Sequence, residues 1–167
     1  PAFFFFFVFS WRDHAMLHSN DGGNPSHRRD LGIAAYLRGI SMQQGGCLQT
    51  AKTDLMYALY ELKDGSGADG WALMAELALL RQLEATGQII AAQNGAMALQ
   101  RRVEDEVGKD SLPWLQTGVF LLELAERAGE MSKYLPQAEE IIAVAARTFP
   151  PAHSLKMRLA RIVAAGL

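Results

Sequence analysis

The sequence predicts an all-α fold, a right-handed superhelix of about three helical hairpins and a terminal helix. Two observations predict it. From Asp30 onward, apolar residues recur at spacings of three and four, whereas long alternating runs of β-branched residues are missing. Gly45, Gly87 and Gly129 each stand where a helix is expected to end, and they are 42 residues apart (87 − 45 and 129 − 87). A period of this size in a helical chain is typical of stacked helix–turn–helix units.

Residues 1–29 are expected to lie outside the repeats. They include an apolar run at residues 3–9, mostly phenylalanine, which is far shorter than the roughly 20 residues needed to span a membrane. The run also lacks the basic residues and the cleavage site of a signal peptide. We expect a buried plug or flanking sequence there, ended by turn-forming residues at 20–26. Because the chain does not begin with Met, we also expect it to be a fragment of a longer protein.

Residues 30–62 are expected to form the first hairpin of a repeat domain that spans residues 30–167. Asp30 offers a carboxylate to the free N–H groups of a helix start, and Gly45 is expected to end this first helix in a left-handed conformation. The second helix is predicted by a stripe of apolar residues at helical spacing: Leu48, Ala51, Leu55, Leu59 and Leu62.

Residues 69–107 are expected to form the second hairpin. Asp69 marks its start, and residues 71–86 are apolar on more than one face, which predicts burial between neighbouring helices. Gly87 separates the two helices. The second helix is predicted by another apolar stripe: Ala92, Ala96, Leu99, Val103 and Val107.

Residues 111–149 are expected to form the third hairpin, and residues 152–165 a terminal helix. Asp110 and Ser111 provide acceptors for the N–H groups at the start of the hairpin. Its second helix is predicted by Ala138, Ile141, Ala145 and Phe149. The terminal helix either caps the array or begins a fourth repeat, and its apolar side consists of Leu155, Leu159 and Ile162.

Small residues stand on the second helices where neighbouring helices of a tetratricopeptide array approach closely: Ala51 and Ala58, Ala92 and Ala96, Ala138 and Ala145. The chain therefore resembles a divergent tetratricopeptide array. Residues 37–45, 75–87 and 153–160 also resemble the C-terminal repeats of large bacterial signalling proteins, which join an adenylate/guanylate cyclase or winged-helix module to a signal-transducing ATPase. This resemblance implies a sensing and scaffolding region that restrains the ATPase and carries no catalytic residue.

The expected function is that of a non-catalytic interaction module. It would bind a protein or peptide segment, or the protein's own N-terminal signalling domains. The first helix of each hairpin is expected to contact the partner. From their positions around these helices, the polar residues expected to make the contacts are Tyr36, Gln43, Glu76, Arg81, Gln82, Glu123 and Arg127. An alternative is a ligand-sensing regulatory domain of a cyclase- or ATPase-linked transcription regulator, in which a small molecule shifts the signalling equilibrium.

The charge balance argues against nucleic-acid and membrane partners. Sixteen Lys and Arg residues stand against eighteen Asp and Glu residues, the formal net charge is −2, and both signs are mixed along the sequence. Cys47 is the only cysteine, which excludes an intramolecular disulfide and a cysteine-rich zinc module, and we expect its thiol to be buried. A single cysteine suits a reducing compartment, so we expect the chain to be cytoplasmic.

Two motifs could carry chemistry, and each has a simpler interpretation. Residues 65–70 match the dinucleotide-binding pattern G-x-G-x-x-G, but a charged helix end precedes them where a strand is required, so a loop is expected. A third candidate function is a small metal-binding protein, since His14 and His18 share one helical face and His27 is near in sequence. We expect these histidines to be exposed and to bind no metal. We therefore predict no metal, no cofactor and no catalytic residue.

Overall fold

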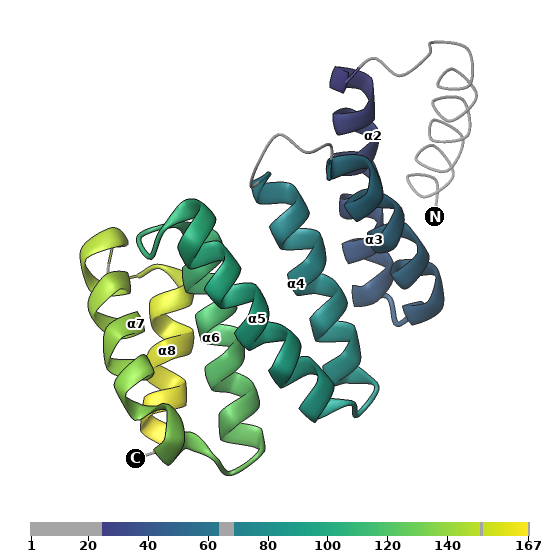
Figure 1. The fold of residues 1–167 in the computed structure, drawn as a ribbon. Helices are drawn as coiled ribbons and strands as arrows, with labels where there is room; N and C mark the ends of the chain where they lie inside the picture. Colours follow the sequence, from purple (N-terminus) through teal and green to yellow (C-terminus); the bar gives the residue numbers. More distant parts are fainter. Residues whose placement is uncertain (1–24, 64–68, 151, 167) are drawn as a thin grey trace. The chain divides into compact units, whose positions relative to one another are not determined.

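The computed structural model describes residues 25–63, 69–150 and 152–166 (Figure 1). The regular elements among these residues are all helices, with no strand, which confirms the all-α prediction. The chain divides into two compact units, one that ends at Ala75 and one that begins at Glu76. Within the described ranges, two complete α-helices belong to the first unit and four to the second.

The described residues form seven α-helices and one 3-10 helix: α2 (Pro25–Gln44), α3 (Leu48–Leu62), α4 (Gly70–Ala85), α5 (Ile89–Val107), α6 (Leu112–Arg127), η1 (Met131–Tyr134), α7 (Leu135–Thr148) and α8 (Ser154–Gly166). The helix start predicted at Asp30 is wrong, because α2 already begins at Pro25. Proline suits a first helical position, where its fixed φ is helical and its missing N–H is not needed. The sequence does not predict η1. None of the described helices is both long and apolar enough to cross a membrane.

Three turns between helices share one hydrogen-bond pattern. Gly46, Gly87 and Gly129 follow α2, α4 and α6 and have positive φ angles of 78°, 80° and 68°. At each glycine, its own N–H and that of the next residue donate to carbonyls three and five positions earlier, which is the Schellman motif. The sequence predicts the left-handed residue at Gly45, and this is wrong. The N–H of Gly45 still donates to the Ser41 carbonyl at 3.0 Å, as a helical residue does.

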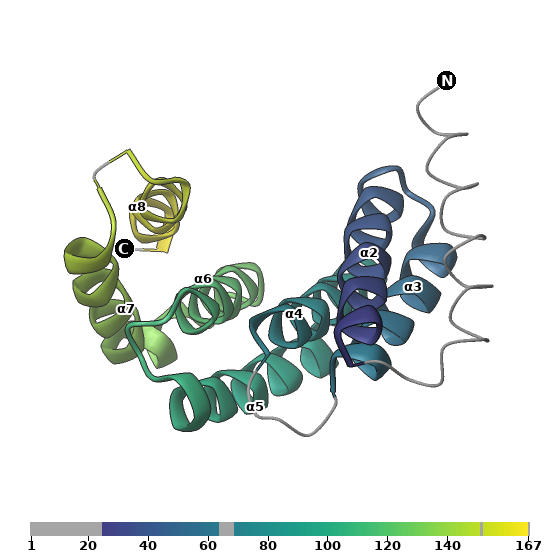
Figure 2. The same cartoon turned by 90° about the horizontal axis from the view of Figure 1, so that it is seen from above.

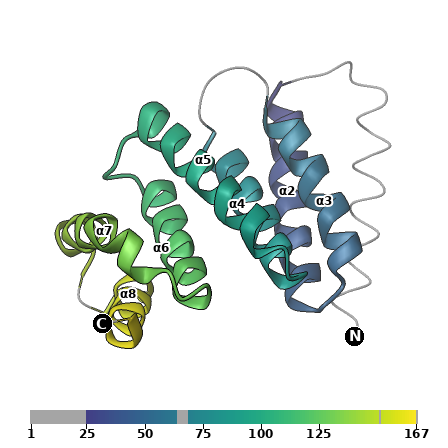
Figure 3. The same ribbon diagram turned by 60° about the horizontal axis from the view of Figure 1, so that its bottom comes forward.

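In the first unit, α2 and α3 pack side by side (Figures 1 and 3). The two helices approach closely at Gly39, where a Cβ atom would lie 2.9 Å from the Cγ atom of Leu55 and 3.4 Å from the carbonyl oxygen of Ala51. Nε of Arg38 donates to Oδ2 of Asp54 at 2.7 Å, in an ion pair that is largely buried. The apolar core between the helices includes Leu31, Ala35, Ala51, Leu55, Ala58 and Leu62. Apolar packing and a buried ion pair therefore join these two helices.

Helix α6 is the centre of the second unit. It packs against α5, η1, α7 and α8, and Figure 2 shows it between α5 on one side and α7 and α8 on the other. A helix that is apolar around most of its circumference needs such neighbours on several sides. Its largest buried side chains are Trp114, Leu115, Phe120, Leu121, Leu122 and Leu124. Because α6 is central, the few polar side chains that it carries lie next to side chains of the neighbouring helices.

The helix starts predicted at Asp69 and Ser111 are confirmed. Oδ1 of Asp69 accepts a hydrogen bond from the N–H of Trp71 at 2.7 Å, at the beginning of α4. Oγ of Ser111 accepts one from the N–H of Trp114 at 3.4 Å, at the beginning of α6. Such caps satisfy N–H groups that have no partner inside the helix. The glycine motif at 65–70 follows helix α3, as expected, although its residues 65–68 lie outside the described ranges.

Candidate functional site

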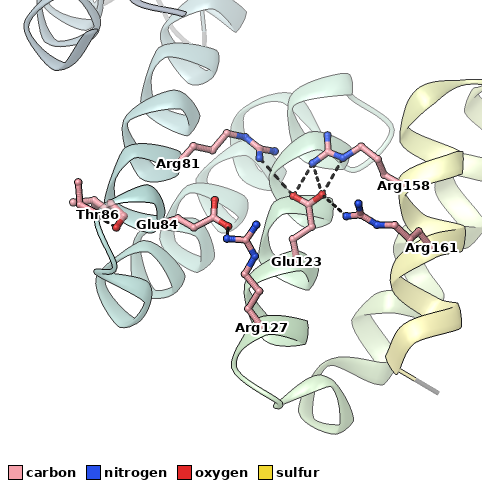
Figure 4. Close-up of polar contacts among 8 residues, drawn as sticks. Arg81, Glu84, Thr86, Glu123, Arg127, Arg158 and Arg161 are labelled. Atoms are coloured by element: carbon pink, nitrogen blue, oxygen red, sulfur yellow. Dashed lines mark hydrogen bonds and ion pairs between the residues drawn. The ribbon is translucent and has the colours of Figure 1, made fainter. Parts of the chain in front are cut away.

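Six charged side chains from three helices, all six within the second unit, meet at one place (Figure 4). Each helix supplies two of them, three or four positions apart, and this spacing puts both on the same helix face. We call this group the arginine cluster. It consists of Arg81 and Glu84 of α4, Glu123 and Arg127 of α6, and Arg158 and Arg161 of α8.

Glu123 lies at the middle of the arginine cluster, and only 12% of its side chain is exposed. Its Oε1 accepts hydrogen bonds from Nε and Nη2 of Arg158, at 3.0 Å and 2.6 Å. Nη1 of Arg81 lies 3.5 Å from Oε2, and Nη2 of Arg161 lies 3.9 Å from Oε1. Forked bonds between a guanidinium and a carboxylate are among the strongest in proteins. One carboxylate thus connects α4, α6 and α8.

Arg81 is the most enclosed cation of the cluster. Its guanidinium carbon lies 4.6 Å from the centre of the Phe120 ring, an arrangement that is attractive because the ring face is electron-rich. Burial lowers the pKa of Arg81, and the negative charge of Glu123 opposes this shift. An arginine nevertheless stays charged at neutral pH. The charge of Arg81 therefore depends on Glu123 and Phe120 for its stabilisation.

The arginine cluster carries a surplus of positive charge. Four guanidinium groups face two carboxylates, which leaves a net charge of +2 (4 − 2). Nη1 of Arg127 lies 2.5 Å from Oε1 of Glu84. The side chains of Arg127 and Arg161 are 62% and 70% exposed, and each guanidinium carries five N–H donors. Exposed, incompletely paired guanidinium groups can bind an added anion, so we take this cluster as the candidate site.

The structure brings together three of the seven residues expected to contact a partner. Arg81, Glu123 and Arg127 all belong to the arginine cluster. Glu76 also lies on α4, but it forms an ion pair with Arg102 of α5.

The other three predicted contact residues lie elsewhere. Gln82 is buried. Tyr36 of the first unit is also buried, and its ring meets the ring of Trp71 edge to face, with the two ring centres 5.5 Å apart. Gln43, in the same unit, is partly exposed. Burial leaves Gln82 and Tyr36 little side-chain surface for a partner to contact.

Sequence reasoning missed Glu84, Arg158 and Arg161. The last two are separated from Glu123 by more than 30 residues, so nothing local in the sequence indicates that they meet it. A weak signal was available, because both arginines lie on the predicted terminal helix off its apolar stripe and three positions apart. Such a pair indicates a charged helix face but does not identify its partner.

The metal-site alternative finds no support in the described residues. His14 and His18 lie outside them, and His27 is exposed on α2. Within the described ranges, no three His, Cys, Asp or Glu side chains are placed to hold a metal ion. The expectation of a buried thiol is wrong, since Cys47 is exposed at the N-terminal cap of α3. A cap position lies in a turn between helices, and turns usually run over the surface.

Comparisons with known proteins assign no family to this chain. No protein-family model matches it, and neither does any curated protein or solved structure. The resemblance to tetratricopeptide repeats and to bacterial signalling ATPases therefore stays a prediction. Function has to be argued from the site itself.

Proposed function

We propose that the chain is a non-catalytic interaction module, a tetratricopeptide-like, right-handed helical-repeat region of a larger bacterial signalling protein. Its role is to bind a segment of a partner protein or of its own longer polypeptide. The arginine cluster is the observation that carries this proposal, because its residues come from α4, α6 and α8, the first helices of successive predicted repeats. Helical-repeat proteins present such equivalent faces as extended binding surfaces.

The helix ends support the repeat part of the proposal. Gly46, Gly87 and Gly129 close the first helix of each predicted hairpin with the same hydrogen bonds, at intervals of 41 and 42 residues (87 − 46 and 129 − 87). In the second unit, α6 also packs against α8, the next first helix, as well as against α5 and α7. Contacts between one first helix and the next are what stacked hairpins require.

Selection from a library of random displayed peptides tests the proposal. The purified chain serves as the target, and selected peptides are synthesised and titrated by fluorescence anisotropy. We expect saturable binding, mutual competition, and slower amide hydrogen exchange in α6 and α8 when a peptide is bound.

Failure to select any peptide that binds saturably would contradict the proposal, as would protection confined to α5 and α7. Saturable binding of a small metabolite without any peptide binder would favour the ligand-sensing alternative.

A further inference from the structure

We infer that the segment bound by this module is acidic, and that the guanidinium groups of Arg127 and Arg161 receive two of its carboxylates. This inference rests on the proposed function and deepens it. It names the chemistry of the partner segment and the two side chains that recognise it.

The arginine cluster is a locally positive part of a negatively charged chain. The whole chain has a formal net charge of −2, yet this one place has a surplus of two positive charges. Because the whole chain is negative, the positive surplus of the arginine cluster is a local feature and not a property of the whole surface. Two carboxylates from a partner would balance the surplus, and electrostatic complementarity of this kind favours specific association.

The four arginines of the cluster fall into two inner and two outer ones. Arg81 and Arg158 are about one-third exposed and make hydrogen bonds to Glu123. Arg161 is 70% exposed and approaches Glu123 only at 3.9 Å, and in the described part of the chain it makes no closer polar contact. Arg127 is 62% exposed and contacts Glu84. The two inner arginines therefore serve the fold, whereas the two outer ones keep N–H donors directed to solvent.

One of the two outer arginines, Arg127, is held in place before a partner arrives. Glu84 is 10% exposed and Glu123 is 12% exposed, so both carboxylates are anchored against the helices. Glu84 holds the guanidinium of Arg127 at 2.5 Å, whereas Arg161 lies only within electrostatic range of Glu123, at 3.9 Å. Side chains that are ordered in advance lose less conformational entropy on binding, which favours affinity.

The placement of the two outer arginines suits a peptide better than a single small anion. Figure 4 shows Arg127 and Arg161 on either side of the Glu123 side chain, and they come from two different helices. The two guanidinium groups, with a carboxylate between them, can each bind one of two acidic side chains of a single peptide. Met157 lies one turn before Arg161 on α8, and its 64% exposure offers an apolar contact on the same helix face.

A double variant, Arg127→Gln with Arg161→Gln, tests the inference in the full chain. The matched control is Arg147→Gln, because Arg147 is 61% exposed, pairs with Asp110, and lies on α7 outside the arginine cluster. Circular dichroism and thermal melts establish that all three proteins fold. The peptide library is selected on each, and the best binders are remade with every Glu and Asp replaced by Gln and Asn.

We expect peptides selected on the unmodified chain to be rich in Asp and Glu. Loss of their carboxylates, or the double variant, should weaken binding by about tenfold or more, the factor that corresponds to two modest charge contacts. The Arg147→Gln control should bind within about twofold of the unmodified chain, in line with the small effect of distant exposed charges. Rising salt should weaken binding to the unmodified chain more than binding to the double variant.

Three results would overturn the inference: selected peptides without acidic residues, equal losses in the double variant and the control, or displacement of bound peptide by inorganic phosphate as effective as that by unlabelled peptide. If neutral peptides bind and protect α6 and α8, the proposed function stands and only this inference fails. If no peptide of any composition binds, both fail.

Discussion

Glu123 shows how a single side chain can connect several helices of this protein. Its carboxylate is largely buried and contacts guanidinium groups from α4 and α8, while its own backbone belongs to α6. A buried charge is tolerated only when partners compensate for its lost hydration, and here three arginines do so. Removing the carboxylate would leave Arg81 enclosed beside Phe120 without its counter-charge.

The variant Glu123→Gln keeps the size of the side chain and removes its charge. We expect the free energy of unfolding to fall by about 2–3 kcal/mol, between the values typical of exposed and of fully buried ion pairs. Urea denaturation monitored by circular dichroism measures this change. The control Glu140→Gln alters a carboxylate that is 43% exposed and pairs with Lys109, and should cost less than about 1 kcal/mol. Equal losses in the two variants would contradict the central role of Glu123.

At the scale of elements, the ends of α2, α4 and α6 are defined by glycines rather than by side-chain caps. Each of these helices ends in a Schellman motif whose glycine has a positive φ, a conformation that a Cβ atom disfavours. At the end of α2 two glycines stand together, and only the second adopts this conformation. The pair therefore offers an internal comparison between a glycine that the turn requires and one that it does not.

We expect Gly46→Ala to lower the free energy of unfolding by about 1–2 kcal/mol, because alanine is strained at positive φ. By contrast, Gly45→Ala should be neutral or should stabilise the protein by up to about 1 kcal/mol, since alanine restricts the unfolded chain. A Cβ atom at Gly45 would find its nearest neighbour at 3.5 Å, an ordinary contact. Thermal and urea denaturation of both variants measure the difference. A larger loss from Gly45→Ala than from Gly46→Ala would contradict the assignment of the turn.

At the scale of the whole molecule, charge is balanced overall and uneven locally. Sixteen basic and eighteen acidic residues give the net charge of −2, while the arginine cluster holds four arginines against two glutamates. Binding to a nucleic-acid backbone depends on neutralising many phosphates over an extended surface. Six charged side chains at one place, two of them negative, do not provide such a surface.

We therefore expect no retention of duplex DNA or single-stranded RNA by the full chain at physiological salt. Electrophoretic mobility shift with labelled nucleic acids checks this. Weak binding at low salt that disappears by physiological salt would agree with a purely local electrostatic contact. A shift that persists at physiological salt would show that the charge argument is wrong.

The all-helical character of the described residues, most of their helix boundaries and two helix caps were predictable from the sequence. Apolar stripes such as Leu48, Ala51 and Leu55 are local patterns, and so are the caps at Asp69 and Ser111, because each depends on residues two to four positions away. Half of the arginine cluster was also predictable, since Arg81, Glu123 and Arg127 stand on polar faces of recognisable helices.

Tertiary packing set the features that depend on contacts between helices. It buried Gln82, which the sequence places among the residues expected to contact a partner. It also brought Arg158 and Arg161 of α8 to Glu123 of α6, far away in sequence. The physical reason is that helical periodicity identifies the faces of each helix, whereas contacts between faces depend on how side chains of separate helices pack together.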